Sequence, residues 1–476
     1  MIFDTIGKWI RQVFGMIGQG DIKSKLGVDV ACSEGMADAQ QLWLSMYRDN
    51  PPWKSQTVQT LGLPASIARE IARLTTIEMK GSVTGSARAA YLQEQLEPLL
   101  MSIRPQIEIA AACGGMALKP YADNGLIRVD CVRADAFFPT AYDGGGNVTG
   151  AVFVERYTHG GVYYTRLEQH EHRSKLYTIT NKAYASRNRS TLEREIDLAE
   201  VDRWASLAPS VTIENVERPL FAYFRTPLAN DIDPAGPLGV SVYAGAVDLI
   251  READRQYSRL LWEFEGSELA IDASADLFQR VEHKFKKTDG ATGSTVEYKL
   301  PKGRERLFRL VNFNSDQATG DSLAMKTFAP QIRDTSYLNG LNAQLQRIEF
   351  ACGLAYGTLS EPQSVDKTAT EIKMSRQRSY ALVADMQARL EAALNHLVYA
   401  MDVLATIYRL APAGGYETAW EWDDSIIVDT DVEFNRRLLL VQAGILRPEA
   451  LYAWYFGTTE EQARELLPQM TAILEP

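Results

Sequence analysis

Few residues in this sequence have a type and spacing that could perform chemistry. His170 and His172, in QHEHR, alternate along a predicted strand and would point to the same face, as two metal ligands could. The chain has only five histidines, and no third ligand lies near this pair in the sequence. Because a metal site needs more ligands than two, we interpret these histidines as part of a solvated strand edge.

Other clusters lack the pattern that cofactor binding or catalysis needs. The acidic stretch WDDSIIVDTD lacks the glycine turn and closing glutamate of a calcium loop. The stretch DGGGN at 143–147 lies between two predicted strands, which indicates a hairpin turn rather than a dinucleotide-binding turn. The sequence contains no GxxxxGK[ST], GxSxG or HExxH motif. It therefore predicts no metal, no cofactor and no catalytic residue, as in a protein that is not an enzyme.

Positive charge is concentrated in two places in a chain whose net charge is −11. Residues 279–310 contain nine Lys or Arg and four Asp or Glu residues. This segment could be a solvated surface, a docking face for an acidic partner, or a contact with the DNA backbone. Its candidate docking residues are Lys284, Lys286, Lys287, Lys302, Arg304, Arg306 and Arg309.

The second basic stretch, SVDKTATEIKMSRQR at 364–378, begins the longest predicted helix. Lys367, Lys373, Arg376 and Arg378 are balanced there only by Asp366 and Glu371.

Composition indicates an ordinary globular protein. Its 476 residues are 46% hydrophobic and 23% charged, and no apolar run reaches the roughly 20 residues of a membrane helix. The first 20 residues predict an amphipathic helix packed on the body or on a neighbouring subunit, with membrane-surface binding as the alternative. Four well-separated cysteines indicate a reducing environment. The acidic net charge argues against wrapping of DNA around the whole surface but allows local contacts.

The elements that must position these residues follow from periodicity and predict an α+β fold. Residues 35–112 are predicted to be helical, with interruptions at Pro98 and Pro105, and residues 116–224 form an antiparallel meander. A Pro- and Gly-rich linker then leads to a helix with a seam of seven positions from Tyr243 to Phe264. The basic segment, a helix over about 321–352, a loop, a helix over 367–408 and a C-terminal helical unit follow. The helix over 367–408 has an apolar stripe at Val383, Met386, Leu390, Ala393, Leu397, Met401 and Leu404.

Several ordered stretches resemble the portal proteins of tailed bacteriophages, in the branch found in long-tailed phages and prophages. They are ACGGMALKPY, DAFFPTAYD, VYYTRLEQH, ERPLFAYFRTPLAND, GPLGVSVYAGAVDLI, DRQYSRLLWEFEGSE and TATEIK. The resemblance covers roughly residues 50–470. It implies a portal fold with wing, stem, clip and crown regions, assembled as a ring around a central channel.

The resemblance also implies a region for each part of the chain. Residues 1–239 and 369–408 correspond to the wing, and residues 240–268 and 321–352 to two stem helices. Residues 269–320 correspond to the clip, residues 353–368 to the tunnel loop, and residues 409–476 to a short crown-like unit. Lys367, Lys373 and Arg376 would then lie near the narrowest part of the channel. There they would touch DNA phosphates lightly, or pair with acidic groups of a neighbouring subunit.

The implied partners are those of a channel at one capsid vertex. They are about twelve copies of the chain itself, double-stranded DNA, the terminase large subunit, the head–tail adaptor, the major capsid protein and scaffold protein, with no membrane. The implied location is the virion, after assembly in the host bacterial cytoplasm. Two alternatives remain open: another capsid-associated structural or adaptor protein, and a cytosolic enzyme with an unrecognised active site.

Overall fold

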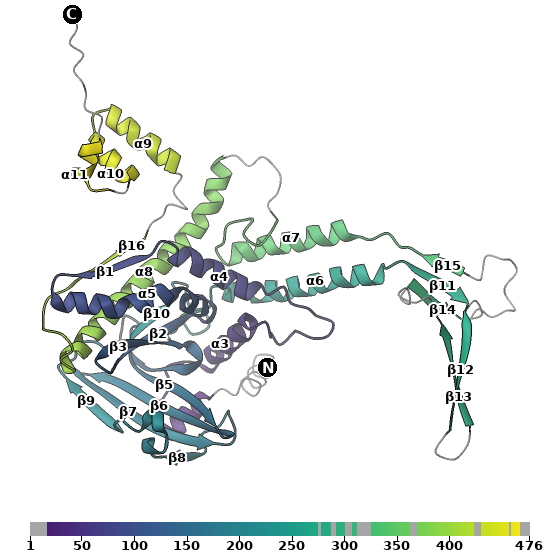
Figure 1. Cartoon of the computed structure of the whole chain (residues 1–476), viewed down its shortest axis with the longest axis horizontal. Coiled ribbons are helices and arrows are strands. Elements are labelled where there is room, and N and C mark those ends of the chain that lie inside the picture. Colours follow the sequence, from purple (N-terminus) through teal and green to yellow (C-terminus); the bar gives the residue numbers. More distant parts are fainter. Residues whose placement is uncertain are drawn as a thin grey trace, which may run out of the picture.

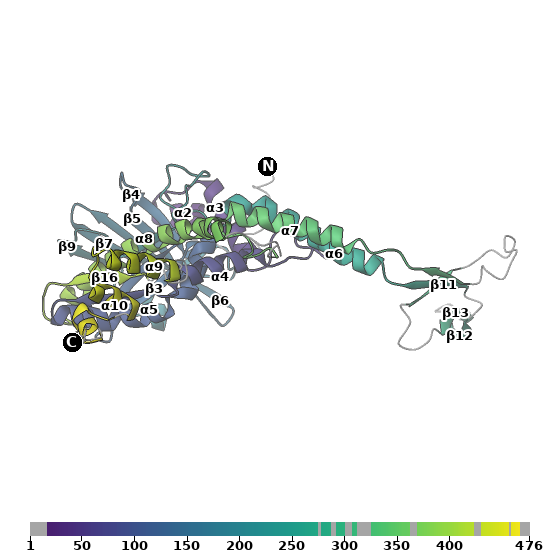
Figure 2. The ribbon, with the colours of Figure 1, turned by 90° about the horizontal axis from the view of Figure 1, so that it is seen from above.

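A computed structural model describes residues 17–274, 278–286, 292–299, 307–311, 325–361, 369–422, 430–456 and 458–466. A body of helices and sheets carries a long two-helix arm with strands at its far end, and a small helical unit follows at the C-terminal side (Figure 1). The arm extends away from the body in both perpendicular views (Figure 2).

In the part of the chain that the structure describes, four helices come before the first large sheet: α2 (Gln19–Leu26), α3 (Glu34–Tyr47), α4 (Leu63–Thr76) and α5 (Ala87–Cys113). The predicted interruptions of α5 are wrong, because the helix runs through Pro98 and Pro105, both on its exposed side. A proline inside a helix costs about 3 kcal/mol. The opposite face of α5 is fully buried at Leu92, Leu96 and Ile107, and each such side chain contributes about 1.5–3 kcal/mol, which offsets the cost.

The antiparallel meander predicted over 116–224 is confirmed, and it divides into two sheets. The smaller has the strand order β10-β2-β3, and the larger has the order β4-β5-β6-β7-β8 with β9 also paired to β7. The strands are β2 (Gly115–Asp123), β3 (Leu126–Arg133), β4 (Phe137–Tyr142), β5 (Val148–His159), β6 (Val162–Arg173), β7 (Leu176–Ser186), β8 (Arg194–Ile196), β9 (Ser210–Glu214) and β10 (Ala222–Arg225). Short 3-10 turns are η1 (Ala134–Ala136), η2 (Leu198–Glu200) and η3 (Asp202–Trp204).

The glycine-rich stretch DGGGN is a hairpin turn, as predicted. It joins β4 to β5, and the Asp143 carboxylate accepts hydrogen bonds from the backbone N–H groups of Gly145 and Asn147, at 2.8 and 2.9 Å. An aspartate that binds the backbone two residues ahead is a common device for fixing a turn.

The long helix α8 (Ala369–Ile407) crosses the body and packs on β2 and β10. All seven positions of its predicted apolar stripe are buried, from Val383 at 2% exposed to Leu404 at 8%. All of them except Val383 join the main hydrophobic core with residues of α4, α5 and the smaller sheet. The predicted helix over 367–408 is therefore confirmed over its described residues.

The arm consists of α6 (Val247–Gly266), which follows the 3-10 turn η4 (Ala244–Ala246), and α7 (Asp334–Ala351). At its far end β11 (Ala270–Ser274) pairs in parallel with β14 (Phe308–Val311) and antiparallel with β15 (Met325–Phe328). A separate hairpin joins β12 (Gln279–Lys286) to β13 (Thr292–Lys299). Helix α7 begins 13 residues later than the predicted start at 321, because 325–328 pair as a strand and Pro330 disfavours helix before it.

After α8 the chain returns to the body before it forms the small C-terminal unit. Strand β16 (Glu417–Glu421) pairs antiparallel with β1 (Lys80–Thr84). The unit comprises α9 (Thr430–Gln442), α10 (Pro448–Phe456) and α11 (Glu460–Leu466). The helices of this unit thus follow β16 along the chain. Among the described residues, no helix combines the length and apolar character needed to span a membrane.

Candidate functional site

The two helices of the arm run antiparallel and pack on each other, and the buried residues of α6 differ from the predicted seam near its end. Tyr243, Ile250 and Asp254 are buried as predicted, but Phe264 is 44% exposed. Leu260 and Glu263 are buried in its place. An ideal helix drifts by about 20° per heptad relative to a strict 4,3 spacing, which moves the seam off the last predicted position.

An ion pair closes the far end of the arm. The Arg333 guanidinium donates to both oxygens of the Glu263 carboxylate, from Nε at 3.0 Å and from Nη2 at 2.8 Å, and the Arg333 backbone N–H also donates, at 3.3 Å. These hydrogen bonds hold the pKa of Glu263 below its ordinary value. Because Arg333 immediately precedes α7, the pair joins the end of one helix to the start of the other.

Three of the seven candidate docking residues fall on the strands at the end of the arm. Lys284 and Lys286 belong to β12 and Arg309 to β14, and their side chains lie outside the described residues. Lys287, Lys302, Arg304 and Arg306 lie outside the described residues altogether. The structure therefore places three of the seven along the backbone of this end and leaves the other four as predictions.

The turn that follows α7 is built around one carboxylate. Glu349 has no exposed surface, and its Oε1 accepts hydrogen bonds from the backbone N–H groups of Gly357, Leu359 and Ser360, at 3.1, 2.6 and 2.8 Å. Its Oε2 accepts a hydrogen bond from Ser360 Oγ at 2.9 Å. We name residues 353–361 the α7 turn. Gly353 begins it with a φ of 70°, a left-handed conformation that glycine adopts without strain.

Helix α8 holds the same turn from the other side. The Ala355 N–H donates to Ser379 Oγ at 2.7 Å, and the Arg378 guanidinium lies 4.1 Å from the ring centroid of Phe350 and 5.9 Å from that of Tyr356. Arg378 belongs to the basic stretch noted in the sequence, and here it packs on aromatic rings. Lys373 and Arg376 belong to α8 with side chains outside the described residues, and Lys367 lies outside them entirely.

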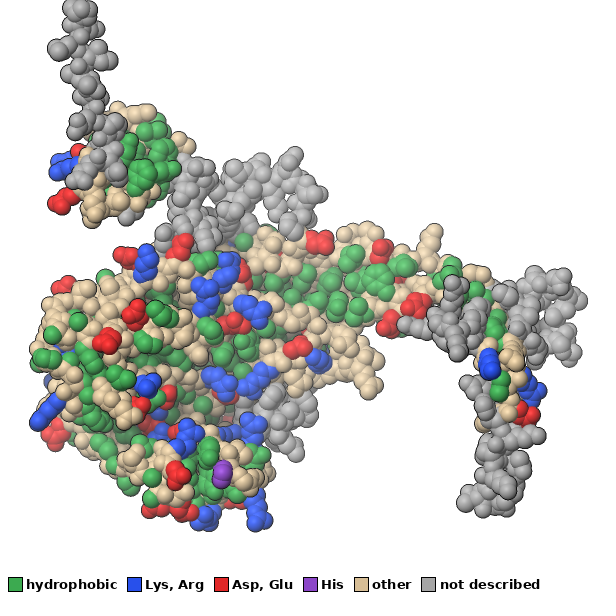
Figure 3. All heavy atoms as spheres, viewed as in Figure 1, with side chains coloured by type: hydrophobic (Ala, Val, Ile, Leu, Met, Phe, Trp, Pro, Cys, Tyr) green, Lys and Arg blue, Asp and Glu red, His purple; other side chains and the backbone are tan. Residues whose placement is uncertain are grey.

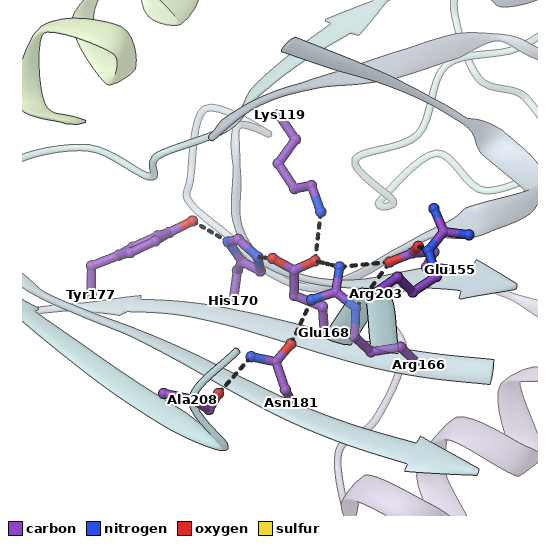
Figure 4. Close-up of polar contacts among 9 residues, drawn as sticks. All are labelled: Lys119, Glu155, Arg166, Glu168, His170, Tyr177, Asn181, Arg203 and Ala208. Atoms are coloured by element: carbon purple, nitrogen blue, oxygen red, sulfur yellow. Dashed lines mark hydrogen bonds and ion pairs between the residues drawn. The ribbon is translucent and has the colours of Figure 1, made fainter. Parts of the chain in front are cut away.

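The interpretation of His170 as a solvated strand residue is wrong. The side chain is 3% exposed and lies in a buried polar network between the two sheets (Figure 4). Its Nε2 lies 2.9 Å from the Glu168 carboxylate, which can only accept, so Nε2 carries the proton and Nδ1 accepts from the Tyr177 hydroxyl at 2.5 Å. His172 contacts the Val216 carbonyl instead. In the described part of the chain, no group of three His, Cys, Asp or Glu side chains could hold a metal ion.

The rest of this network consists of alternating charges. Glu168 accepts from Lys119 at 2.5 Å and from Arg166 at 2.9 Å, and Arg166 also pairs with Glu155 at 2.8 Å (Figure 4). Burial alone would raise the pKa of Glu168, but Lys119, His170 and Arg166 outweigh it and hold that pKa well below its ordinary value. Burial lowers the pKa of His170, with Glu168 opposing it. Because Lys119 is on β2 and Glu168 on β6, the network joins the two sheets.

Sequence reasoning missed the two residues that organise the ends of α7 and α8. Glu349 lies in an amphipathic helix pattern that gives no sign of its partners eight to eleven residues later. Arg88, 2% exposed, binds the C-terminal end of α8 more than 300 residues away in sequence. Both contacts depend on how the chain folds back on itself, which no local motif encodes.

Residues 107–472 match the family model described as phage portal protein, SPP1 Gp6-like. The chain belongs to this family. It is therefore a phage portal protein, the head–tail connector of a bacteriophage, and its role in DNA packaging follows from the family. The family is structural and implies an oligomeric ring with capsid and terminase partners. No curated protein matches the chain.

Proposed function

We propose that about twelve copies of this portal protein form a ring at one capsid vertex, with a channel through which double-stranded DNA is packaged and ejected. The observation that supports this arrangement is the arm. Two antiparallel helices leave the body, carry strands at their far end, and return to the α7 turn and α8 (Figures 1 and 2). This order suits a subunit whose body lies in a ring while its arm follows the channel.

We propose that the arm is the stem, that its end strands are the clip, and that the body is the wing. Hydrophobic side chains are exposed along the arm (Figure 3). They include Trp262, Ile332 and Leu338, at 66%, 44% and 45% exposed. Apolar surface of this extent on a slender arm favours burial against a neighbouring copy. The C-terminal helical unit would be a short crown.

The end of the arm would dock the terminase large subunit during packaging and the head–tail adaptor afterwards. Its basic residues, led by Lys284, Lys286 and Arg309, would pair with acidic groups of these partners. Lys367, Lys373 and Arg376 would lie by the channel, where a few exposed cations bind phosphates weakly at physiological salt. The ring would assemble in the host bacterial cytoplasm, with the major capsid protein and scaffold protein as partners, and the protein would have no enzymatic activity of its own.

Negative-stain electron microscopy with native mass spectrometry on the same sample tests the ring. We expect rings with a central hole and about twelve subunits. A sample that stays small when concentrated, in high salt and with scaffold protein present would contradict the proposal. If rings form, the double variant Lys367→Ala, Lys373→Ala would test whether these two lysines act in the channel. We expect these substitutions to change the salt dependence of DNA packaging while ring formation is retained.

A further inference from the structure

We infer that Glu349 is the positioning residue of the α7 turn, and that residues 353–361 form a fixed shoulder between α7 and α8 rather than part of a mobile loop. This inference rests on the proposed function, in which the resemblance makes residues 353–368 the tunnel loop. The inference divides residues 353–368 at Glu361, and α7 holds residues 353–361 in place.

The first argument is that the Glu349 carboxylate is buried and that, among the described residues, its partners are hydrogen-bond donors of the turn rather than a cation. Glu349 has no exposed surface, and its carboxylate meets three backbone N–H groups and one hydroxyl of the α7 turn. A buried carboxylate is costly unless it is hydrogen-bonded, and hydrogen bonds to a charged group are stronger than neutral ones. Four donors from residues 357–360 satisfy this one side chain. The burial of this carboxylate and the shape of the turn therefore depend on each other.

The second argument is that further contacts hold the turn at both of its ends. Ala355 donates to Ser379 on α8 at 2.7 Å, and Glu361 donates its N–H to Asn342 Oδ1 on α7 at 2.8 Å. Tyr356 lies beside the Arg378 guanidinium, which also covers Phe350. The turn is thus fixed at its start, middle and end to the two helices that flank it, α7 of the arm and α8 of the body.

A fixed turn would transmit force between the channel and the arm during DNA passage. In the proposed channel, forces on whatever follows Glu361 would be transmitted to α7 through the Glu349 hydrogen bonds. The turn would act as the support that joins the arm to α8. Loss of the Glu349 acceptors would release residues 357–360 while leaving the apolar seam between α6 and α7 intact.

Hydrogen exchange measured on the full-length protein tests the support directly. We expect slow exchange at the amides of Gly357, Leu359 and Ser360 in the wild-type protein. In Glu349→Ala we expect exchange at these amides to accelerate on the order of 100-fold, because the turn can then open without breaking hydrogen bonds to a carboxylate. Glu349→Gln keeps Oε1 as a neutral acceptor, so we expect intermediate exchange, and this variant serves if the alanine variant fails to fold. Glu361→Gln is the matched control, because it removes the same charge from an exposed residue of the same turn.

Packaging of DNA by the assembled particle supplies the functional readout. We expect Glu349→Gln to form rings of normal size and to package less DNA than Glu361→Gln does. Unchanged exchange at residues 357–360, or acceleration spread evenly over the whole chain, would overturn the positioning role. Accelerated exchange with normal packaging would leave the positioning role of Glu349 standing and would overturn only the importance of the turn for DNA passage. Wild-type protein that forms no ring would instead contradict the proposed function.

Discussion

At the scale of single residues, Arg88 shows how one buried cation can complete a helix end. Its guanidinium donates to the carbonyls of Asp402, Ala411 and Pro412, at 3.0, 2.7 and 3.0 Å, and to the side chains of Asp402 and Thr406, at 3.1 Å each. Asp402 belongs to the last turns of α8 and Ala411 and Pro412 follow the helix, and arginine has five donors in a rigid fork that can reach all three. Arg88 therefore joins the start of α5 to the end of α8.

We predict that Arg88→Ala lowers the free energy of unfolding by about 3–5 kcal/mol, because it removes a buried cation together with five hydrogen bonds and leaves the partly buried Asp402 carboxylate without its ion pair. Arg88→Lys should recover only part of this loss, since an ammonium group cannot reach the same set of acceptors. Thermal unfolding followed by differential scanning fluorimetry would measure the change. The control is Arg69→Ala, because the Arg69 side chain is 67% exposed and we expect a change within about 0.5 kcal/mol. Equal melting temperatures for the two alanine variants would contradict the prediction.

The buried network around His170 predicts loss of stability in acid. The pKa values of Glu168 and His170 are both lowered in the folded protein. The unfolded chain therefore binds protons that the folded chain excludes, and the free energy of unfolding falls as the pH drops. The loss begins near the ordinary pKa of each group in the unfolded chain, about 6.5 for His170 and about 4.3 for Glu168. Melting temperatures measured between pH 8 and pH 5 should decline, and His170→Gln should flatten this decline. His159→Gln, at an exposed histidine of β5, should leave the slope as it is.

At the scale of elements, Asp254 connects α6 to the loop between α3 and α4. Its two oxygens accept hydrogen bonds from the Trp53 indole N–H and from the Leu61 backbone N–H, both at 2.9 Å. We predict that Asp254→Asn loosens this loop, because the amide turns a donor toward one of the two N–H groups. Trypsin should then cut faster after Lys54, which lies within the loop. Glu252→Gln, on the exposed side of the same helix, should leave the cleavage rate unchanged, and equal rates for both variants would rule out this anchoring role.

Elements with a strong repeating pattern could be predicted from the sequence, and elements defined by distant partners could not. The stripe of α8 recurs over six turns, and every predicted position is buried. The start of α7 was missed because residues 325–328 become a strand only through pairing with β11. Propensity rules also failed at Pro98, where packing of α5 outweighs the local penalty.

The same limit applies to the candidate site. The basic stretch at 364–378 was visible as a charge pattern, yet the position of Arg378 between Phe350 and Tyr356 depends on the packing of α8 against α7. Glu349 was invisible because a carboxylate in a helix is normally solvent-exposed. Its role comes from a turn that returns to it after eight residues, and such a return is a tertiary property.

At the scale of the whole molecule, the body extends to β16, whereas α9, α10 and α11 form a separate unit beyond it (Figure 1). Trp420 of β16 covers Gly81 of β1 and donates to Asn395 of α8 at 2.8 Å, and Trp422 donates to Glu391 at 3.0 Å. A side chain at position 81 would collide with the Trp420 ring, so glycine is needed there.

We predict that a chain truncated after Trp422 melts within about 1 °C of the full-length protein, because the contacts that hold the body remain. A chain truncated after Gly415 should melt several degrees lower. It loses the pairing of β16 with β1 and exposes Val83, which is 3% exposed in the intact protein. Removal of Trp420 alone forfeits about 1.5–3 kcal/mol of apolar burial. If both truncations lowered the melting temperature equally, the C-terminal unit would have to stabilise the body directly, and the boundary drawn at β16 would be wrong.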